Sequence, residues 1–236
     1  MMAGESNHKG LFFVFEGVNG CGKSTQVLRA RNWLRANYND FIVVWAKEPT
    51  DGSVGRHIYR ALKNPQFLKL LGPTALQSWF ALDSLEHLKG SVIPFLSTTE
   101  AVVFLCDRYR YSLVHSAHSV SDIQRLIDLN VAILGDNLIT PDLVFIFDVS
   151  PKVAIERLKN SGKNLDAQET FEEISRTREN YLKIAELCPR NVHIIDSNKN
   201  EKEVFGEVSR IIKIEIERAS LKIKRKQENA QIIKTL

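Results

Sequence analysis

The chain has 236 residues, with 32 lysines and arginines against 28 acidic residues and 44% apolar side chains. This composition excludes an intrinsically disordered protein, and the length suits one domain with a sizeable core. No apolar run approaches the roughly 20 residues that span a bilayer, and residues 1–10 lack the apolar stretch of a signal peptide. The three cysteines form no CxxC pair, which argues against a disulfide framework or a zinc site. We therefore expect a cytoplasmic protein with no membrane partner.

Short apolar runs rich in Val, Ile and Phe recur along the chain, and each is followed by a longer amphipathic stretch. The runs are 11–15, 41–45, 101–106, 143–149 and 192–195. Because they are unbroken rather than alternating, they predict strands covered on both faces, as in a parallel sheet flanked by helices. Residues 24–37 and 121–134 show helical spacing of their apolar side chains. The pattern predicts an α/β fold with a doubly wound, five-stranded parallel sheet.

The first run leads directly into a full match to the pattern GxxxxGK[ST]. Its members are Gly17, Val18, Asn19, Gly20, Cys21, Gly22, Lys23, Ser24 and Thr25. In such a phosphate loop, backbone N–H groups and the start of the following helix face a phosphate. Lys23 would reach the β- and γ-phosphates, and the Ser24 hydroxyl would bind Mg²⁺. The alternative is a glycine turn with an incidental lysine, but the position between a strand and a helix favours a nucleoside triphosphate site.

Two charged residues follow the third run at the predicted carboxyl edge of the sheet. Asp107 would face the metal of the phosphate loop, although a helix N-cap is the alternative. Arg108 would direct a bidentate donor at a phosphate in the same cleft. Further along, cations flank the polar stretch 160–168, namely Arg157, Lys159, Lys163, Arg176 and Arg178. They predict a flap near 157–169 that brings positive charge to a transferred phosphoryl group, unless they form a solvated helix face with the interleaved glutamates.

Six segments of the sequence are informative together, because of the order and spacing in which they occur. They are 12–26, the acidic-proline loop 47–56, residues 80–87 with 93–96, Asp107-Arg108-Tyr109 with Ser112, residues 141–149, and residues 171–181. In this order they resemble the thymidylate kinases over nearly the whole chain. The resemblance implies a phosphate-loop kinase domain over residues 1–212, followed by a basic helical tail over 213–236. It also implies ATP as phosphoryl donor, Mg²⁺, and the homodimer that is usual in the family.

The activity implied by the resemblance is transfer of the γ-phosphoryl group of ATP to a nucleoside monophosphate, with dTMP giving dTDP as the first expectation. The implied catalytic residues are Lys23, Arg108, Lys159 and Lys163, and the metal ligands are Ser24 and Asp107. The implied monophosphate site comprises Glu48, Phe80, Ser84, Arg108, Ser112 and Ser116. Phe80 would stack on the base, with a core phenylalanine as the alternative. Glu48 would face the acceptor sugar or the metal, with a solvated loop carboxylate as the alternative.

Several positions depart from the family pattern. Ser84 stands where an arginine usually donates to the thymine carbonyl, and Ser116 replaces an aromatic residue near the deoxyribose. Leu113 occupies a position that is often small, and the nearby His115 and His118 either compensate or pack. Asn19 replaces an acid. Gly20 stands where some members place an arginine, whereas members without it use flap arginines in place of the lysines found here. A kinase for another nucleoside monophosphate, or a weakened nucleotide-binding protein, is therefore the alternative function.

The remaining alternatives have less support. Residues 107–110 lack the glycine of a GTPase switch, and residues 198–201 lack the aspartate that reads guanine. A nucleic-acid ATPase has only the basic tail in its favour. From residue 213 onward there are seven basic and three acidic side chains, which accounts for the whole net charge of +4. The tail therefore predicts a solvated helix end, with a weak contact to nucleic acid or a partner as the alternative. Phosphate binding must then come from local groups rather than from a global field.

Overall fold

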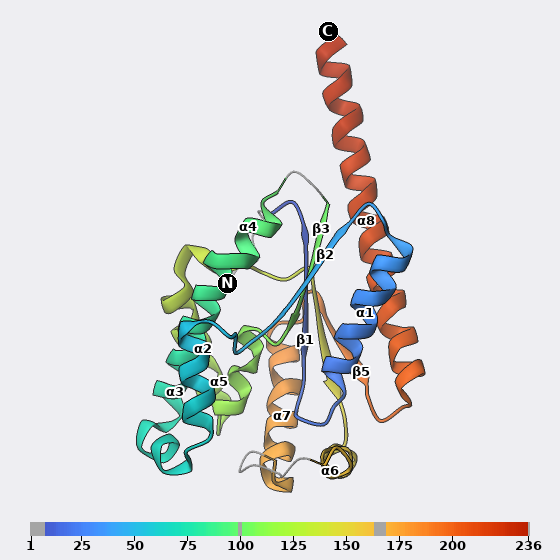
Figure 1. The fold of residues 1–236 in the computed structure, drawn as a ribbon. Coiled ribbons are helices and arrows are strands. Elements are labelled where there is room, and N and C mark those ends of the chain that lie inside the picture. The colour runs from blue at the N-terminus through green and yellow to red at the C-terminus, as the bar shows by residue number, and fades with distance from the viewer. Residues whose placement is uncertain (1–7, 99–100, 163–168, 236) are drawn as a thin grey trace.

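The computed structural model describes residues 8–98, 101–162 and 169–235, with side chains placed up to Leu221. The chain forms one sheet with helices on both faces (Figure 1). The strands are β1 Leu11–Glu16, β2 Ile42–Lys47, β3 Val102–Asp107, β4 Leu143–Asp148 and β5 Val192–Asp196. They are parallel and lie in the order β2-β3-β1-β4-β5. The prediction of a five-stranded, doubly wound parallel sheet is confirmed.

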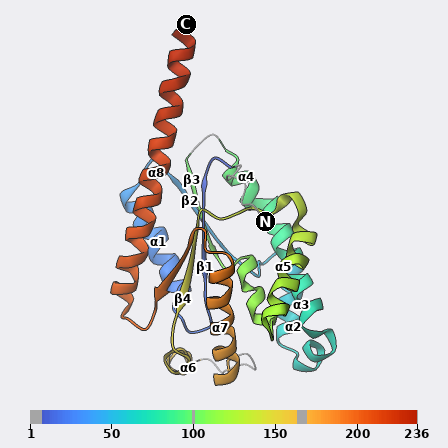
Figure 2. The same ribbon diagram turned by 180° about the vertical axis from the view of Figure 1, so that it is seen from behind.

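The helices alternate with the strands along the chain. They are α1 Lys23–Asn37, α2 Ser53–Leu62, α3 Pro65–His87, α4 Ile93–Leu96, α5 Val120–Leu134, α6 Pro151–Asn160, α7 Phe171–Leu187 and α8 Glu201–Thr235. A π-helix, η1 Leu88–Val92, and two 3₁₀ helices, η2 Arg110–Ser116 and η3 Gly135–Asn137, complete the elements. Figures 1 and 2 show α1 and α8 together on one side of the sheet and α2 to α5 on the other. Both predicted helices, 24–37 and 121–134, correspond to α1 and α5.

The core lies between the sheet and these helix layers. Every residue of β1 and β3 is buried, which explains why their sequences are unbroken apolar runs. Aromatic rings from neighbouring strands meet there, such as Phe12 and Phe104 at 6.0 Å between ring centroids. Phe15 and Phe147 stack at the same separation. The strands at the two edges, β2 and β5, contain exposed positions because a neighbouring strand covers each on one side alone.

The carboxyl ends of the central strands meet at one edge, where the site is built. Phe15 of β1 and Lys47 of β2 both lie in register with Asp107, the last residue of β3. Glu16 ends β1 and the phosphate loop follows it directly. The sheet therefore brings the segments after β1, β2 and β3 together, as expected for a fold of this class.

The C-terminal part of the chain is one long helix. Figures 1 and 2 show α8 passing along α1 and then extending away from the body. The basic stretch that begins at residue 213 lies inside this helix, and the secondary structure does not break there. The division into a 1–212 domain and a 213–236 tail thus stays a prediction. Among the described residues, no helix is long and apolar enough to cross a membrane.

Candidate active site

The phosphate loop joins β1 to α1 through backbone conformations that favour glycine. Gly17, Gly20 and Gly22 have φ values of 146°, 79° and 88°. A Cβ at Gly20 would come within 2.4 Å of the Ala154 carbonyl oxygen in α6. The arginine that some thymidylate kinases place at this position would therefore need α6 to move. Glycine here is a requirement of the packing as well as of the turn.

The start of α1 is free to receive an anion. Gly22 is its N-cap and has no side chain that could cap the helix, and its first turn contains no acidic residue. The first N–H groups of a helix and its dipole then favour a phosphate at this end. Lys23 opens the helix and is 8% exposed. Burial, followed by the charge of Arg108, lowers the pKa of Lys23 below its ordinary value. A bound anion would oppose both effects, because its negative charge favours the protonated ammonium.

Ser24 and Asp107 form a pair suited to a divalent cation. The Ser24 hydroxyl donates to Asp107 Oδ2 at 2.5 Å. The other carboxylate oxygen, Oδ1, is buried and has no hydrogen-bond partner within the described part of the chain. An unpartnered carboxylate oxygen beside a serine hydroxyl fits Mg²⁺, which prefers hard oxygen ligands. The N-cap alternative for Asp107 does not apply, since the next helix, η2, has Tyr109 as its N-cap with no side-chain cap.

Arg108 has a left-handed backbone, with φ at 77°, and its N–H donates to the Phe15 carbonyl at 2.9 Å. The Arg108 side chain is partly buried. Nη1 lies 3.2 Å from Ser112 Oγ, 3.1 Å from Tyr181 Oη and 3.0 Å from His115 Nε2, and Nη2 donates to Asn19 Oδ1 at 2.8 Å. Burial and then the charge of Arg108 hold the pKa of His115 well below its ordinary value, so this histidine is neutral. Among the described residues, the guanidinium is held by uncharged groups and forms no ion pair.

Glu16 lies beneath this arginine and was not a predicted site residue. Its side chain is completely buried and accepts from the Tyr109 N–H at 2.8 Å, from Ser112 Oγ at 2.7 Å and from Tyr181 Oη at 2.9 Å. Burial raises the pKa of Glu16 to about 7, against the opposing effects of the Arg108 charge and the hydrogen bonds. A charged residue closing an unbroken apolar strand was the signal that could have identified it.

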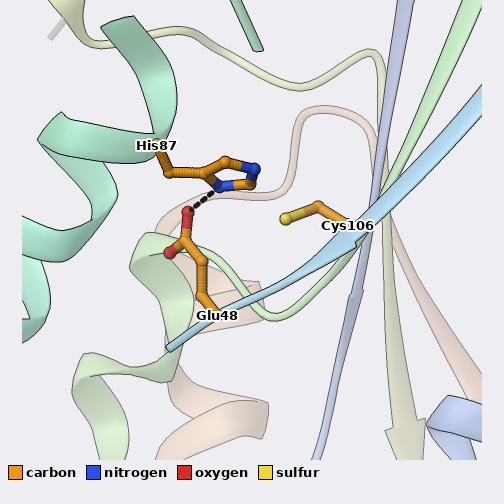
Figure 3. Close-up of side chains that lie close together, drawn as sticks. All are labelled: Glu48, His87 and Cys106. Atoms are coloured by element: carbon orange, nitrogen blue, oxygen red, sulfur yellow. Dashed lines mark hydrogen bonds and ion pairs between the residues drawn. The ribbon is translucent and has the colours of Figure 1, made fainter. Parts of the chain in front are cut away.

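Glu48 follows β2 and is buried rather than solvated. Figure 3 shows its carboxylate beside His87 of α3, with Glu48 Oε1 at 2.8 Å from His87 Nδ1. The other oxygen accepts from Ser84 Oγ at 2.5 Å. Burial raises the pKa of Glu48, opposed by the hydrogen bond and charge of His87. Cys106 Sγ is the third potential metal ligand here, within 4.8 Å of the other two, but it donates to the Arg108 carbonyl. We interpret the group as a hydrogen-bonded cluster.

The acidic-proline loop is fastened to α3 near Glu48. Asp83 accepts from the Thr50 N–H at 2.9 Å and from the Thr50 hydroxyl at 2.6 Å. Phe80 lies one turn earlier on α3 and is partly exposed. Ser116, at the end of η2, lies 3.5 Å from Gln77 Oε1. Strands β2 and β3 and helix α3 thus bring the predicted acceptor-site residues to the same side of the sheet.

Comparison with known proteins fits this arrangement. The family model of thymidylate kinase matches residues 15–208. The chain belongs to the thymidylate kinase family. A probable thymidylate kinase of Pyrococcus horikoshii is 30% identical over 211 residues, covering 88% of this chain and 98% of the relative. A thymidylate kinase of Caldicellulosiruptor saccharolyticus is 33% identical over 208 residues, covering 86% and 96%. The crystal structure of thymidylate kinase from Ehrlichia chaffeensis superposes with a TM-score of 0.64 at 22% identity, covering 86% and 98%.

Members of the thymidylate kinase family are nucleoside monophosphate kinases that use ATP, so the predicted enzyme class is confirmed. Asn19 stands where most members of the family have an acidic residue, and a carboxylate lies beside it. Its Nδ2 donates to Glu169 Oε1 at 3.1 Å while its oxygen accepts from Arg108. A negative charge is therefore present next to this position, supplied by a residue about 150 positions further along the chain.

The predicted flap cations within the described residues have different surroundings. Residues 157–160 form the end of α6, and Lys163 lies outside the described residues. Arg178 pairs with both oxygens of Asp148, at 2.5 and 2.9 Å, and Arg176 pairs with Glu173. Arg176 thus corresponds to the helix-face alternative, whereas Arg178 joins α7 to the end of β4. Lys159 is exposed in the last turn of α6.

Proposed function

We infer that this chain transfers the γ-phosphoryl group of ATP to dTMP, giving ADP and dTDP. The observation that carries this inference is the Arg108 guanidinium. It is partly buried, it is held by uncharged acceptors among the described residues, and it lies at the same sheet edge as Lys23 and the Ser24–Asp107 pair. A partly buried cation without an ion pair gains from an anion that joins it, and a phosphate of the acceptor is an anion that a guanidinium can bind through two hydrogen bonds.

The donor side follows from the phosphate loop. The amide groups at the start of α1 and the Lys23 ammonium would hold the β- and γ-phosphates of ATP. Ser24 and Asp107 would hold Mg²⁺, which neutralises charge on the transferring phosphoryl group when bound. Lys159 and Lys163 are proposed to add positive charge from the flap. The residues of this chain mainly orient the two phosphates, because phosphoryl transfer requires little covalent chemistry from the protein.

The acceptor side follows from Arg108 and from α3. Arg108 would hold the monophosphate, Phe80 would stack on the base, and Ser112 would act by keeping Arg108 in place. Ser84 differs, because its hydroxyl already donates to Glu48 inside the protein. That observation favours a second candidate function, a kinase for another nucleoside monophosphate, since no long donor at this position reaches the base. We also propose the family's usual homodimer, which light scattering of the purified protein can check.

The test is an assay of ADP formation with Mg-ATP and a panel of acceptors: dTMP, dUMP, UMP, CMP, AMP and GMP. The highest kcat/KM with dTMP supports the inference, and a higher value with another acceptor supports the second candidate. The Lys23→Ala variant, purified in the same way, is the control for contaminating kinases. It lacks a side chain that would bind the phosphates, so any activity that remains in its preparation comes from another enzyme. Background rates with all six acceptors would exclude both functions.

A further inference from the structure

Tyr181 is a buried tyrosine of α7 that lies 73 positions from Arg108 in the sequence but beside it in the fold. Its ring packs edge-on against His115 with 5.7 Å between centroids. Its hydroxyl lies 3.1 Å from Arg108 Nη1 and 2.9 Å from Glu16 Oε2, between two groups that carry opposite charges when Glu16 is ionised. A phenylalanine would fill the same space, so packing accounts for the ring of Tyr181 but not for its hydroxyl group.

The direction of both hydrogen bonds is fixed by chemistry. A guanidinium has donors and no acceptor, so the Tyr181 oxygen must accept from Arg108. Its single proton is then available for the Glu16 carboxylate, which accepts it. Burial raises the pKa of the Tyr181 hydroxyl well above its ordinary value, so this proton is retained. The hydroxyl therefore connects a fixed carboxylate to the guanidinium.

Glu16 is an effective anchor because the backbone itself holds it. It closes β1 in the middle of the sheet, and the Tyr109 N–H donates to its other oxygen, Oε1, at 2.8 Å. Ser112 Oγ donates to Oε2 at 2.7 Å and lies 3.2 Å from Arg108 Nη1. The guanidinium is thus linked to the central strand through two hydroxyl groups rather than by a direct ion pair. This arrangement orients the arginine without neutralising it.

We propose that Tyr181 is a positioning residue, which holds the Arg108 guanidinium in the orientation that receives the acceptor phosphate and acts through Glu16. The role rests on the proposed function, in which Arg108 binds that phosphate. An arginine side chain has several rotatable bonds. Loss of one fixed hydrogen-bond partner therefore lets the guanidinium move away from the orientation that binds the acceptor phosphate. A small displacement of a group that orients reacting phosphates lowers both binding and turnover.

The test compares Tyr181→Phe with a matched control, Tyr111→Phe. Both tyrosines are buried, and both accept a hydrogen bond from an arginine Nη, since Tyr111 Oη lies 3.4 Å from Arg110 Nη2. A hydrogen bond to a charged group contributes enough free energy that its loss in Tyr181→Phe should raise KM for dTMP about tenfold. The KM for ATP should stay within about twofold of the wild type, because the donor side does not use this hydroxyl. Tyr111→Phe should change neither constant.

A double-mutant cycle distinguishes positioning from general packing. In an Arg108→Lys background, the lysine ammonium has no planar group whose orientation matters. Adding Tyr181→Phe to that variant should therefore change kcat/KM for dTMP by less than about twofold. Equal losses in both backgrounds, or an unchanged KM for dTMP in Tyr181→Phe, would overturn the role of Tyr181. Thermal melting of each variant identifies losses caused by unfolding. If the wild type forms no ADP with any monophosphate, the proposed function itself fails.

Discussion

The buried carboxyl of Glu16 should make the stability of the protein depend on pH in a direction that can be calculated. Its pKa is raised from 4.5 to about 7 in the folded protein, because burial outweighs the charge of Arg108 and three hydrogen bonds. Between these two pH values the folded state holds a proton that the unfolded state has lost. The contribution of Glu16 to stability is therefore full below about pH 4.5, falls as the pH rises towards 7, and is lost above that.

The magnitude follows from the two pKa values. Their difference of about 2.5 corresponds to about 3 kcal/mol of unfolding free energy. Between pH 5 and pH 8 the linkage relation gives about 2.5 kcal/mol, with the protein more stable at the lower pH. Glu16→Gln is the appropriate perturbation, since it keeps the size of the side chain and its acceptor for the Tyr109 N–H while removing the titration.

The assay is urea unfolding of nucleotide-free wild type and Glu16→Gln at pH 5 and pH 8. Other buried groups titrate as well: burial raises the pKa of Glu48 and lowers that of His115. They are present in both proteins, so the difference between the two profiles isolates Glu16. On going from pH 5 to pH 8, the wild type should lose about 2.5 kcal/mol more than Glu16→Gln. Glu179→Gln, on the exposed face of α7, controls for a change of net charge. Parallel profiles for wild type and Glu16→Gln would refute the reasoning.

Three further substitutions test the proposed site. Lys23→Ala should lower kcat at least roughly 100-fold in the ADP assay, since it removes a ligand of the transferring phosphates; wild-type turnover would contradict its role. Asp107→Asn should raise the Mg²⁺ concentration needed for half-maximal rate, because it removes charge from the unpartnered ligand oxygen; an unchanged Mg²⁺ titration would exclude Asp107 as a ligand. Ser84→Arg should raise the preference for dTMP over CMP by restoring a long donor on α3, and an unchanged ratio of kcat/KM would show that position 84 does not read the base.

The fold was predictable because its signals are local. Each unbroken apolar run became a strand, since burial on both faces leaves no position that must be polar. The phosphate loop was equally predictable from the sequence, because its residues are contiguous and lie between a strand and a helix. Asp107 and Arg108 could be placed at the same edge because parallel strands end together. All three inferences required only neighbouring residues and the topology of the sheet.

The partners of the buried polar groups were not predictable in the same way. Tyr181 contacts Glu16 across 165 positions of sequence, and Glu169 contacts Asn19 across 150. Such pairs depend on how α7 and the segment before it pack against the sheet, which periodicity does not specify. A tyrosine on an otherwise amphipathic helix is indistinguishable from a packing residue until its hydroxyl is located. Glu16 and Tyr181 were therefore missed as parts of the surroundings of Arg108, although Arg108 and its partners Ser112 and Asn19 were identified.

The replacement at position 84 is best understood together with Glu48. A buried carboxylate needs hydrogen-bond donors, and a long arginine on α3 could supply them while also reaching a ligand. With serine at this position, one carboxylate oxygen accepts from the short hydroxyl and the other from His87. Both oxygens of Glu48 are therefore hydrogen-bonded without an arginine at position 84. In the proposed function, the departure from the family pattern would change which groups face the acceptor base, while the Ser24–Asp107 pair and Arg108 would still be available for phosphoryl transfer.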